Sequence, residues 1–220
     1  MKTNKTDPQL GANIRKHLSE KGVETPFYTT PVPDEDKQRD ITTDFASIMR
    51  TLGLDLNDDS LRDTPRRVAK MFVDEIFYGL DYINFPKCTA VDNKMKYDEM
   101  VIEKNITSIS NCEHHFVVID GLCNIAYIPG DKVLGLSKLN RIVDFFSKRP
   151  QIQERLTEQI YYALEFILET KDIAVTLTAV HYCVKSRGIR DTNSSTTTSK
   201  MGGRFREDDS LRKEFLSLID

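Results

Sequence analysis

The stretch Met100–Ile128, MVIEKNITSISNCEHHFVVIDGLCNIAYI, decides how this 220-residue chain folds. Two runs rich in β-branched and apolar residues, 100–110 and 116–128, enclose the polar segment SNCEHHF. Such runs, bounded by polar clusters, are typical of strands. We therefore predict antiparallel β-structure here. We place a hairpin turn at Asp120-Gly121, because an Asp-Gly pair favours the two-residue turns that join antiparallel strands.

Segments with helical periodicity surround these strands. Apolar residues at helical spacing predict a helix over 42–54, and Thr64-Pro65 starts another that ends at Gly79. The remaining predictions are a helix over 137–146 capped by Ser137, a helix over 150–168, a strand over 172–184 and a short C-terminal helix. Together they indicate an α+β fold, with antiparallel strands covered by helices on one face.

No internal repeat or long low-complexity tract divides the chain, which reads as one large domain with an appendage. We divide it into a variable N-terminal helix and arm over 1–40, a helical region over 41–97 and a catalytic domain over 98–220. The first part holds four of the eight prolines and lies before the first strongly periodic helix.

Composition and charge exclude several classes of protein. The net charge of −3 excludes a globally basic nucleic-acid-binding protein. No run approaches ~18 apolar residues, and the first residues lack the apolar core of a signal peptide, so we expect a cytoplasmic protein that does not bind membranes. A hydrophobic fraction of 39% is low for a self-contained globule and fits an oligomer that hides further surface.

The segment SNCEHHF concentrates side chains that bind metal ions. Cys112 and His115 have a spacing that a tight turn can bring to one ion, and zinc takes both residue types. In the strand predicted over 172–184, His181 and Cys183 would point to the same face, because side chains alternate along a strand. Three of the four histidines and two of the four cysteines thus fall in two short segments.

Two alternative arrangements of this cluster stay open. A closed structural zinc site needs four nitrogen or sulfur ligands, which are nominally available, and Cys112 could instead form a disulfide with Cys183. Five candidate groups exceed what one tetrahedral ion needs, however, and the surplus imidazoles suit acid–base chemistry. The remaining two cysteines, Cys88 and Cys123, fit better as buried core thiols.

A set of basic and polar residues accompanies the metal-binding cluster. Ser137, Lys138 and Arg141 open a predicted helix, where free backbone N–H groups favour an anion. Arg187 follows the strand that carries His181, and Lys70 shares a helix face with Arg67 three residues earlier. Each group alone is commonly a solvated surface, but beside a metal site they suggest a polyphosphate ligand.

The segment QIQE, residues 151–154, places Glu154 in the first turn of a predicted helix. An acidic residue there usually complements the helix dipole. A carboxylate at this position could also accept hydrogen bonds from the N1–H and the 2-amino group of a guanine. The spacing does not decide between these two roles.

Several long motifs resemble those of the GTP cyclohydrolase I family. They are CEHH, AYIP, GLSKLNRIVDFF, RPQIQER and VHYCVKSRGIRD, and they occur in the family's order from about Thr42 to the C-terminus. The chain is most similar to the bacterial type, because its N-terminal arm is short. The resemblance implies the tunnelling fold, in which strands from several subunits join into a barrel. It also implies a homodecamer of two stacked pentamers with active sites between subunits.

The same resemblance implies a set of functional residues. Zn²⁺ would be held by Cys112, His115 and Cys183, while His114 and His181 would transfer protons. Glu154, with Gln153 nearby, would bind the guanine, and Glu113 would orient its neighbours. The residues facing the triphosphate would be Ser137, Lys138, Arg141, Arg187 and Lys70.

The reaction implied is the conversion of GTP and water to 7,8-dihydroneopterin triphosphate and formate, the first step of pterin and tetrahydrofolate biosynthesis. A zinc ion can lower the pKa of water from ~15.7 toward ~7, and an imidazole with a pKa near ~6.5 can move the protons.

Three rival classes of protein bear on the same residues. The main alternative is a zinc-stabilised, non-catalytic protein of the same fold that binds a purine or a pterin. A nitrile reductase on this fold would lack CEHH, and a zinc nucleobase deaminase would need the H-x-E and P-C-x-x-C motifs, which this chain does not contain.

Overall fold

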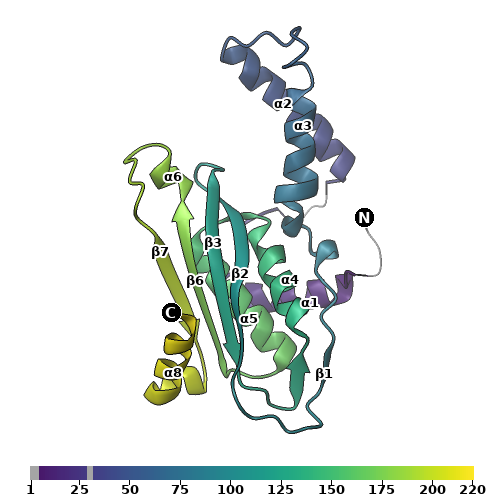
Figure 1. Ribbon diagram of the computed structural model, residues 1–220. Coiled ribbons are helices and arrows are strands. Elements are labelled where there is room, and N and C mark those ends of the chain that lie inside the picture. Colours follow the sequence, from purple (N-terminus) through teal and green to yellow (C-terminus); the bar gives the residue numbers. More distant parts are fainter. Residues whose placement is uncertain (1–4, 29–31) are drawn as a thin grey trace.

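The computed structural model describes residues 5–28 and 32–220 as an α+β body from which a helical hairpin projects (Figure 1). The helices are α1 (Pro8–Glu20), α2 (Asp34–Thr51), α3 (Thr64–Met71), α4 (Leu136–Ser147), α5 (Gln153–Leu168), α6 (Tyr182–Lys185), α7 (Arg204–Glu207) and α8 (Asp209–Ile219). Short helical turns, η1 (Phe72–Ile76), η2 (Tyr78–Leu80) and η3 (Tyr82–Asn84), follow α3. The strands are β1 (Ala90–Asp92), β2 (Val101–Cys112), β3 (Val118–Tyr127), β4 (Lys132–Leu134), β5 (Pro150–Gln151), β6 (Ile173–His181) and β7 (Thr196–Met201).

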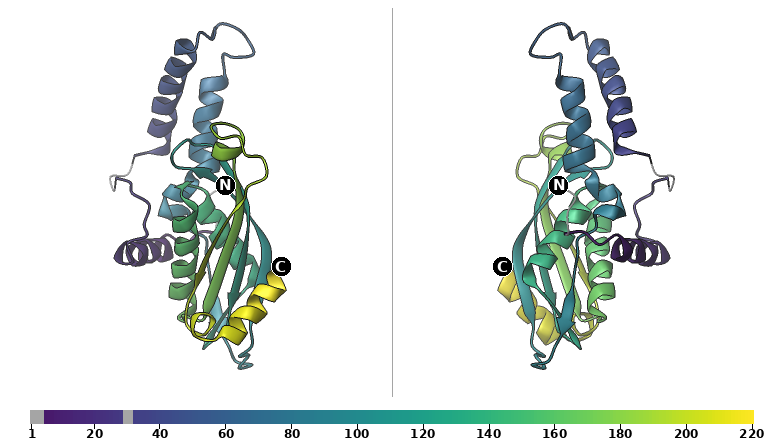
Figure 2. Two further views of the ribbon diagram at one scale, coloured as in Figure 1. Left: turned by 90° about the vertical axis from the view of Figure 1, so that its left-hand side faces the viewer. Right: turned by 90° about the vertical axis from the view of Figure 1, so that its right-hand side faces the viewer.

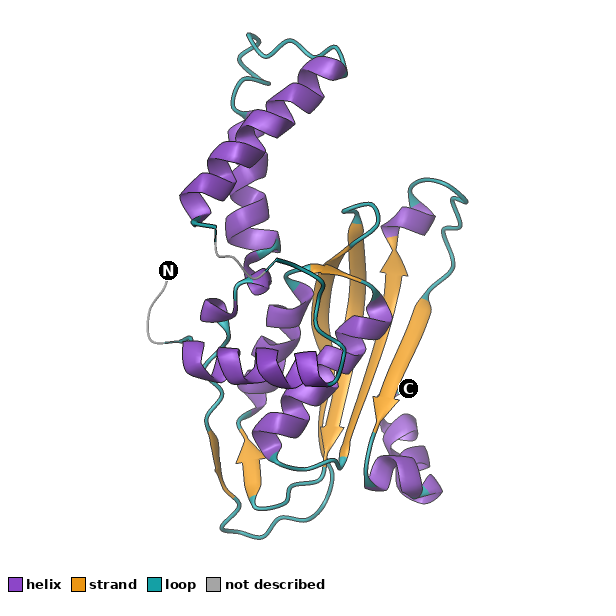
Figure 3. Cartoon of the chain, turned by 180° about the vertical axis from the view of Figure 1, so that it is seen from behind, coloured by secondary structure: helices purple, strands orange, loops and turns teal. Residues whose placement is uncertain are grey.

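The main sheet has five strands in the order β5-β2-β3-β6-β7. All neighbours are antiparallel except β5, which pairs with the end of β2 in parallel. A separate two-stranded sheet joins β1 and β4. Helices α4 and α5 cover one face of the main sheet (Figure 2 and Figure 3). The predicted α+β class, with helices packed on one face of an antiparallel sheet, is confirmed.

The main core lies between α4, α5 and the sheet. Each helix presents an apolar stripe to the strands, and inward-facing residues of β2 and β3 complete the packing. The fully buried members include Leu139, Ile142, Phe146, Leu156, Ile160, Leu164, Cys123 and Ile125. Because this core lies along the whole length of both helices, it gives the sheet a rigid backing.

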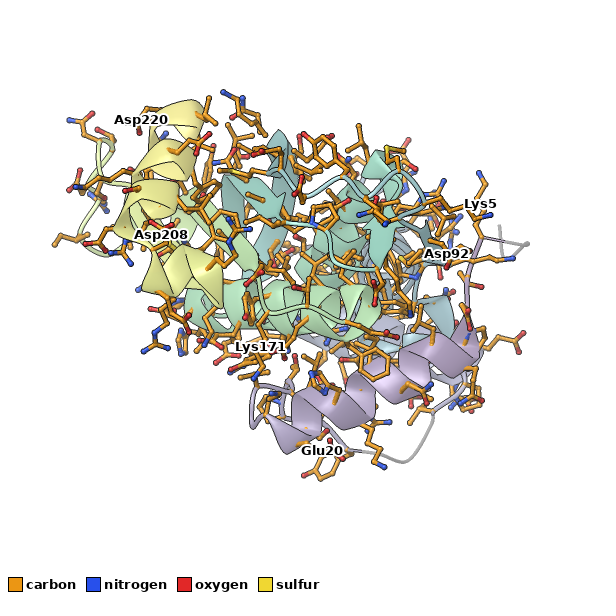
Figure 4. All side chains as sticks on the ribbon, turned by 90° about the horizontal axis from the view of Figure 1, so that it is seen from below. Lys5, Glu20, Asp92, Lys171, Asp208 and Asp220 are labelled. Carbon is orange, nitrogen blue, oxygen red and sulfur yellow. The ribbon has the colours of Figure 1, made fainter. Side chains whose placement is uncertain are left out.

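A smaller core closes part of the opposite face. Phe205 of α7 and Phe215 of α8 are fully buried and cluster with Ala126, Ile128 and Ala174. Seen from below, α8, which is flanked by Asp208 and Asp220, lies apart from α1, which ends at Glu20 (Figure 4). The C-terminal helix predicted from the sequence therefore anchors one end of the sheet.

A buried ion pair ties the N-terminal segment to the body. Arg149 is fully buried between α4 and β5, and its guanidinium donates to Glu24 Oε1 (3.2 Å), to the Tyr82 hydroxyl (3.3 Å) and to the Gly79 carbonyl. The guanidinium carbon also lies 4.9–5.0 Å from the ring centroids of Tyr82, Phe145 and Phe146. The Arg149 carbonyl accepts a hydrogen bond from Ser110 of β2. Arg149 therefore connects the segment that carries Glu24 to the main sheet.

The predicted turn at Asp120-Gly121 is wrong. Both residues lie inside β3, where Asp120 pairs with Ile109 on one side and with Val180 on the other. The chain reverses instead between Cys112 and Val118. Gly121 is required for close packing, since a Cβ there would come within 2.6 Å of the Ala179 Cβ. The glycine of this Asp-Gly pair therefore allows β3 and β6 to approach closely, which is another role of glycine within a strand.

The helix boundaries differ from the prediction in several places. Helix α2 begins eight residues before 42, and the helix that starts at Thr64 gives way to η1 after Met71. Gly79 is buried, and a Cβ there would meet the Phe145 carbonyl oxygen at 2.1 Å. Ser137 is not an N-cap, because α4 starts at Leu136 with Gly135 as its cap. Helix α5 starts at Gln153, three residues after Pro150.

The predicted strand over 172–184 ends at His181, and residues 182–185 form the helical turn α6. Strands β1, β4, β5 and β7 are not predicted from the sequence. Within 1–40, α1 packs against α5 and η3, whereas residues 1–4 and 29–31 lie outside the described part. The division at 40 and 97 stays a prediction. Over the described residues, no helix is long and apolar enough to cross a membrane.

Candidate metal and active site

Three side chains predicted to bind metal converge at one end of the sheet. Cys112 ends β2, His115 lies in the reversal that leads to β3, and Cys183 lies on α6. Their ligand atoms all lie within 4.8 Å of one another. Cys112 is buried, Cys183 is partly buried and His115 is exposed. The group is therefore anchored in the protein on one side and open to solvent on the other.

The local chain geometry explains how Cys112 and His115 meet. The Cys112 N–H donates to the Val117 carbonyl, and the Phe116 N–H donates to the Cys112 carbonyl, each at 2.8 Å. Phe116 takes a positive φ of 54°, which closes the reversal tightly. Two side chains separated by two residues inside such a turn point to the same place.

Cys183 arrives by a different route from the one predicted. His181 pairs with Ile119 at the end of β6, and the chain then turns into α6, so Cys183 does not share a strand face with His181. The helical turn carries the Cys183 thiol across to Cys112, with which it packs beside Ile119 and Ala179. Figure 1 shows α6 beside the reversal between β2 and β3.

The two thiols and a nearby guanidinium define the electrostatics of the group. Burial raises the pKa of Cys183, and its hydrogen bond to the Cys112 thiol raises it further, whereas the charge of Arg187 opposes both effects. Arg187 also donates to His115 Nε2 at 2.8 Å. A bound cation would favour the thiolates, because metal ligands bind deprotonated.

Glu113, beside His114, is held by Arg155 of α5, a residue that the sequence did not single out. Arg155 forms a two-point ion pair with Glu113, at 2.6 and 3.4 Å. His114 Nε2 lies 3.9 Å from the same carboxylate, and His114 Nδ1 lies 3.7 Å from the Cys112 sulfur. Arg155 stands in the RPQIQER motif, but only the packing of α5 against the reversal shows its partner.

His181 is held by the first turn of α5. Its Nε2 lies 2.7 Å from Gln153 Oε1. Burial lowers the pKa of His181, and the negative charge of Glu154 opposes this shift. Glu154 itself is exposed. The start of α5 therefore places one side chain inside, against His181, and the next one outside.

Lys70 approaches the same end of the molecule through the projecting hairpin. It is exposed on α3, two residues before Phe72. The Phe72 ring contacts those of Phe77 and Phe116, with centroids 5.3 and 6.3 Å away. Because Phe116 belongs to the reversal that carries His115, this aromatic cluster joins the base of the hairpin to the metal-binding group.

The structure does not bring Ser137, Lys138 and Arg141 near the metal-binding group of their own chain. Asn140, in the same turn of α4, donates to Glu103 Oε1 at 3.1 Å. Glu103 lies nine residues before Cys112 on β2, roughly 30 Å along the strand. The basic residues instead adjoin Cys88. Burial raises the pKa of this thiol to about 12, against the opposing charges of Lys138 and Arg141.

Comparisons of the sequence with known proteins point to one family. The model of the family GTP cyclohydrolase I matches residues 41–220. A GTP cyclohydrolase 1 from Serratia proteamaculans is 57% identical over 206 residues, covering 94% of this chain and 93% of that protein. One from Pasteurella multocida is 56% identical over 218 residues, covering 99% of each.

A weaker likeness is found among solved structures. The archaeosine synthase QueF-Like in its apo form gives a TM-score of 0.40 at 18% identity, covering 47% of this chain and 94% of that one. The assignment to a family therefore rests on the sequence matches, which extend over nearly the whole chain and include Cys112, His115 and Cys183. The chain belongs to the GTP cyclohydrolase I family.

Proposed function

We propose that this protein is a zinc-dependent GTP cyclohydrolase I, which converts GTP and water to 7,8-dihydroneopterin triphosphate and formate. The observation that carries the proposal is the convergence of Cys112, His115 and Cys183 within 4.8 Å, inside a chain that matches the family over 41–220. The product would enter pterin and tetrahydrofolate synthesis in the cytoplasm.

The donor set suits zinc. Two thiols and one imidazole are ligands that zinc prefers, and three protein ligands are typical of catalytic sites, whereas structural sites use four. Among the described residues, the metal-binding group contains these three members. An ion held there would polarise water for attack on C8 of the purine. The exposure of His115 leaves room for a substrate on the solvent side.

Proton transfer would fall to His181 and His114. His181 is partly buried with a lowered pKa, so the neutral ring is favoured near pH ~7 and can accept a proton. His114 is exposed beside the Glu113 carboxylate, which Arg155 holds in place. Opening the imidazole ring, releasing formate and closing the pterin ring each need protons to be moved at nitrogen or oxygen atoms. Two imidazoles at one site would meet that need.

Recognition of the guanine would fall to Glu154. It is exposed at the start of α5, and its charge is close enough to raise the pKa of His181. A carboxylate there can accept from both N1–H and the 2-amino group, whereas adenine presents a different edge. Gln153, which was predicted to share this role, is 2% exposed, and its amide nitrogen donates to the carbonyls of Leu177 and Thr196. Of the two neighbours, Glu154 would therefore contact the base.

The triphosphate would be bound by residues from more than one chain. Arg187 and Lys70 lie at the same end of the sheet as the metal-binding group. Ser137, Lys138 and Arg141 lie in the turn of α4 whose Asn140 contacts Glu103. Because Glu103 is roughly 30 Å from Cys112 along β2, these three residues would serve the site of a second copy. This division supports a homo-oligomer with sites between subunits, and we expect the decamer of two pentamers.

The test is direct turnover. Purified, zinc-loaded protein is incubated with GTP, and formate is measured together with the fluorescence of neopterin after oxidation. We expect both products in equal amounts, and no turnover of ATP. A protein with full zinc content and bound GTP that releases no formate would overturn the proposal.

A further inference from the structure

Gln153 has a side chain whose every polar atom is engaged inside the protein. It is 2% exposed. Its Nε2 donates to the carbonyls of Leu177 (2.8 Å) and Thr196 (2.9 Å), and Thr198 Oγ1 lies 3.2 Å away. Backbone carbonyls can only accept hydrogen bonds. The amide nitrogen must therefore face β6 and β7, and the flipped orientation of this side chain is excluded.

The surrounding hydroxyl groups agree with this orientation. Thr157 Oγ1 donates to the backbone carbonyl of Gln153 at 2.9 Å and lies 2.7 Å from Thr198 Oγ1. Since the Thr157 proton is already used, the Thr198 hydroxyl must donate to Thr157. Thr198 is then left with lone pairs toward Gln153 Nε2, which is what a donating amide needs. Neither hydroxyl group then points a proton at Gln153 Nε2, which agrees with an amide nitrogen in this position.

The consequence falls on His181. The Gln153 Oε1 that faces His181 Nε2 at 2.7 Å is an acceptor, so this ring nitrogen must carry the proton. We propose that Gln153 is a positioning residue, which fixes His181 in the Nε2–H tautomer and leaves Nδ1 as the nitrogen that exchanges protons with the substrate. The inference rests on the proposed function for its catalytic meaning, but the tautomer itself follows from the hydrogen bonds alone.

The same network separates the roles of two adjacent residues. The Gln153 amide has no free donor for a guanine, because both of its protons are held by backbone carbonyls. Glu154, the next residue, is exposed. The first turn of α5 would thus hold the base with Glu154 and orient the acid–base histidine with Gln153. The pairing of β6 with β7 positions the groups around the Gln153 amide, since Leu177 and Thr198 are register partners.

The first test reads the tautomer in the intact, zinc-loaded protein. The four histidines are labelled with ¹⁵N, and the signals of His181 are identified by their loss in His181→Asn. The shifts of the two ring nitrogens distinguish a protonated from an unprotonated nitrogen. We expect Nε2 to be protonated and Nδ1 not, at a pH above ~7 where the ring is neutral. Protonation on Nδ1, or an even mixture of both tautomers, would overturn the proposal.

The second test removes the amide. Gln153→Met keeps the length of the side chain but cannot accept from His181, so the ring should populate both tautomers. We expect kcat to fall roughly 10-fold to 100-fold, as is typical when a group that orients a functional residue is lost, with little change in KM and with full zinc content. A raised KM for GTP with an unchanged kcat would instead place Gln153 on the substrate and overturn the proposal.

A matched control separates positioning from loss of stability. Gln159 lies on the same helix, is fully buried and also has its amide engaged, with Gln151, Val23 and Thr25. Gln159→Met should lower the Tm comparably, yet leave kcat and the His181 tautomer unchanged. Equal losses of kcat in both variants would overturn the proposal. If Gln153→Met does not fold, the tautomer of the unaltered protein still decides, and that measurement is independent of whether GTP is turned over.

Discussion

Replacing Arg149 with methionine should destabilise this protein more than the loss of any single exposed ion pair could. Methionine keeps the apolar stem among Phe145 and Phe146 but removes the guanidinium. The Glu24 carboxylate, whose side chain is 13% exposed, then loses its guanidinium partner at 3.2 Å, and the Gly79 carbonyl loses a donor. A charge that was buried as a pair becomes buried alone.

The magnitude follows from that burial. Removing one partner of a buried ion pair typically costs ~3–5 kcal/mol, because the remaining charge stays desolvated. The Tyr82 hydroxyl still donates to Glu24, and this places the expected loss toward the lower end of the range. For a chain of this length, each kcal/mol lowers the Tm by roughly 2–4 °C, so a loss of ~3 kcal/mol should lower the Tm by roughly 6–12 °C.

Calorimetry or circular dichroism at a fixed protein concentration measures the effect, since the Tm of an oligomer depends on concentration. Arg39→Met is the matched control, because Arg39 makes the same kind of ion pair with Asp36 and Asp40 on an exposed helix surface. The control should leave the Tm unchanged within error. A Tm for Arg149→Met that matches the control would refute the view that this buried pair fastens the N-terminal segment to the sheet.

Four further predictions concern the site and the core. Cys112→Ser and Cys183→Ser should each lose zinc while the oligomer survives, because the core lies away from the site. Zinc content is measured by metal analysis and the oligomer by size-exclusion chromatography. Full zinc content in either variant would show that the replaced cysteine is not a ligand. Glu154→Gln should weaken GTP binding by roughly 1.5–3 kcal/mol through loss of a charge-assisted hydrogen bond, and an unchanged affinity in titration calorimetry would show that Glu154 does not bind the guanine. His181→Ala should keep its zinc and lose ~10²–10⁴-fold in turnover, whereas loss of zinc in step with activity would make His181 a ligand. Burial raises the pKa of Cys123 to about 12, so the folded state keeps this thiol protonated while the unfolded chain ionises above ~8.5. The free energy of unfolding should therefore fall by up to ~1.4 kcal/mol per pH unit above ~8.5, and urea titrations of Cys123→Val should show a shallower fall; an equal slope in both proteins would contradict the burial argument.

The sequence by itself determined the features that depend on neighbours along the chain. The stripes of α4 and α5 can be predicted because helical periodicity is a property of residues three and four apart. The meeting of Cys112 and His115 can be predicted because two residues between them need only a tight turn. The long family motifs identify the family for a related reason, since each is a continuous run of residues whose identities can be compared one by one.

The tertiary structure alone decided which distant residues meet. Cys183 reaches Cys112 because β6 pairs with β3 in one register and then turns into α6, which strand periodicity does not predict. The ion pair of Arg155 with Glu113 joins residues 42 positions apart. The distance that separates Lys138 from the metal-binding group likewise follows from where α4 packs along β2. Such contacts arise from strand register and helix packing, which are set by the summed burial of many side chains over the whole domain, and no local stretch of sequence carries that information.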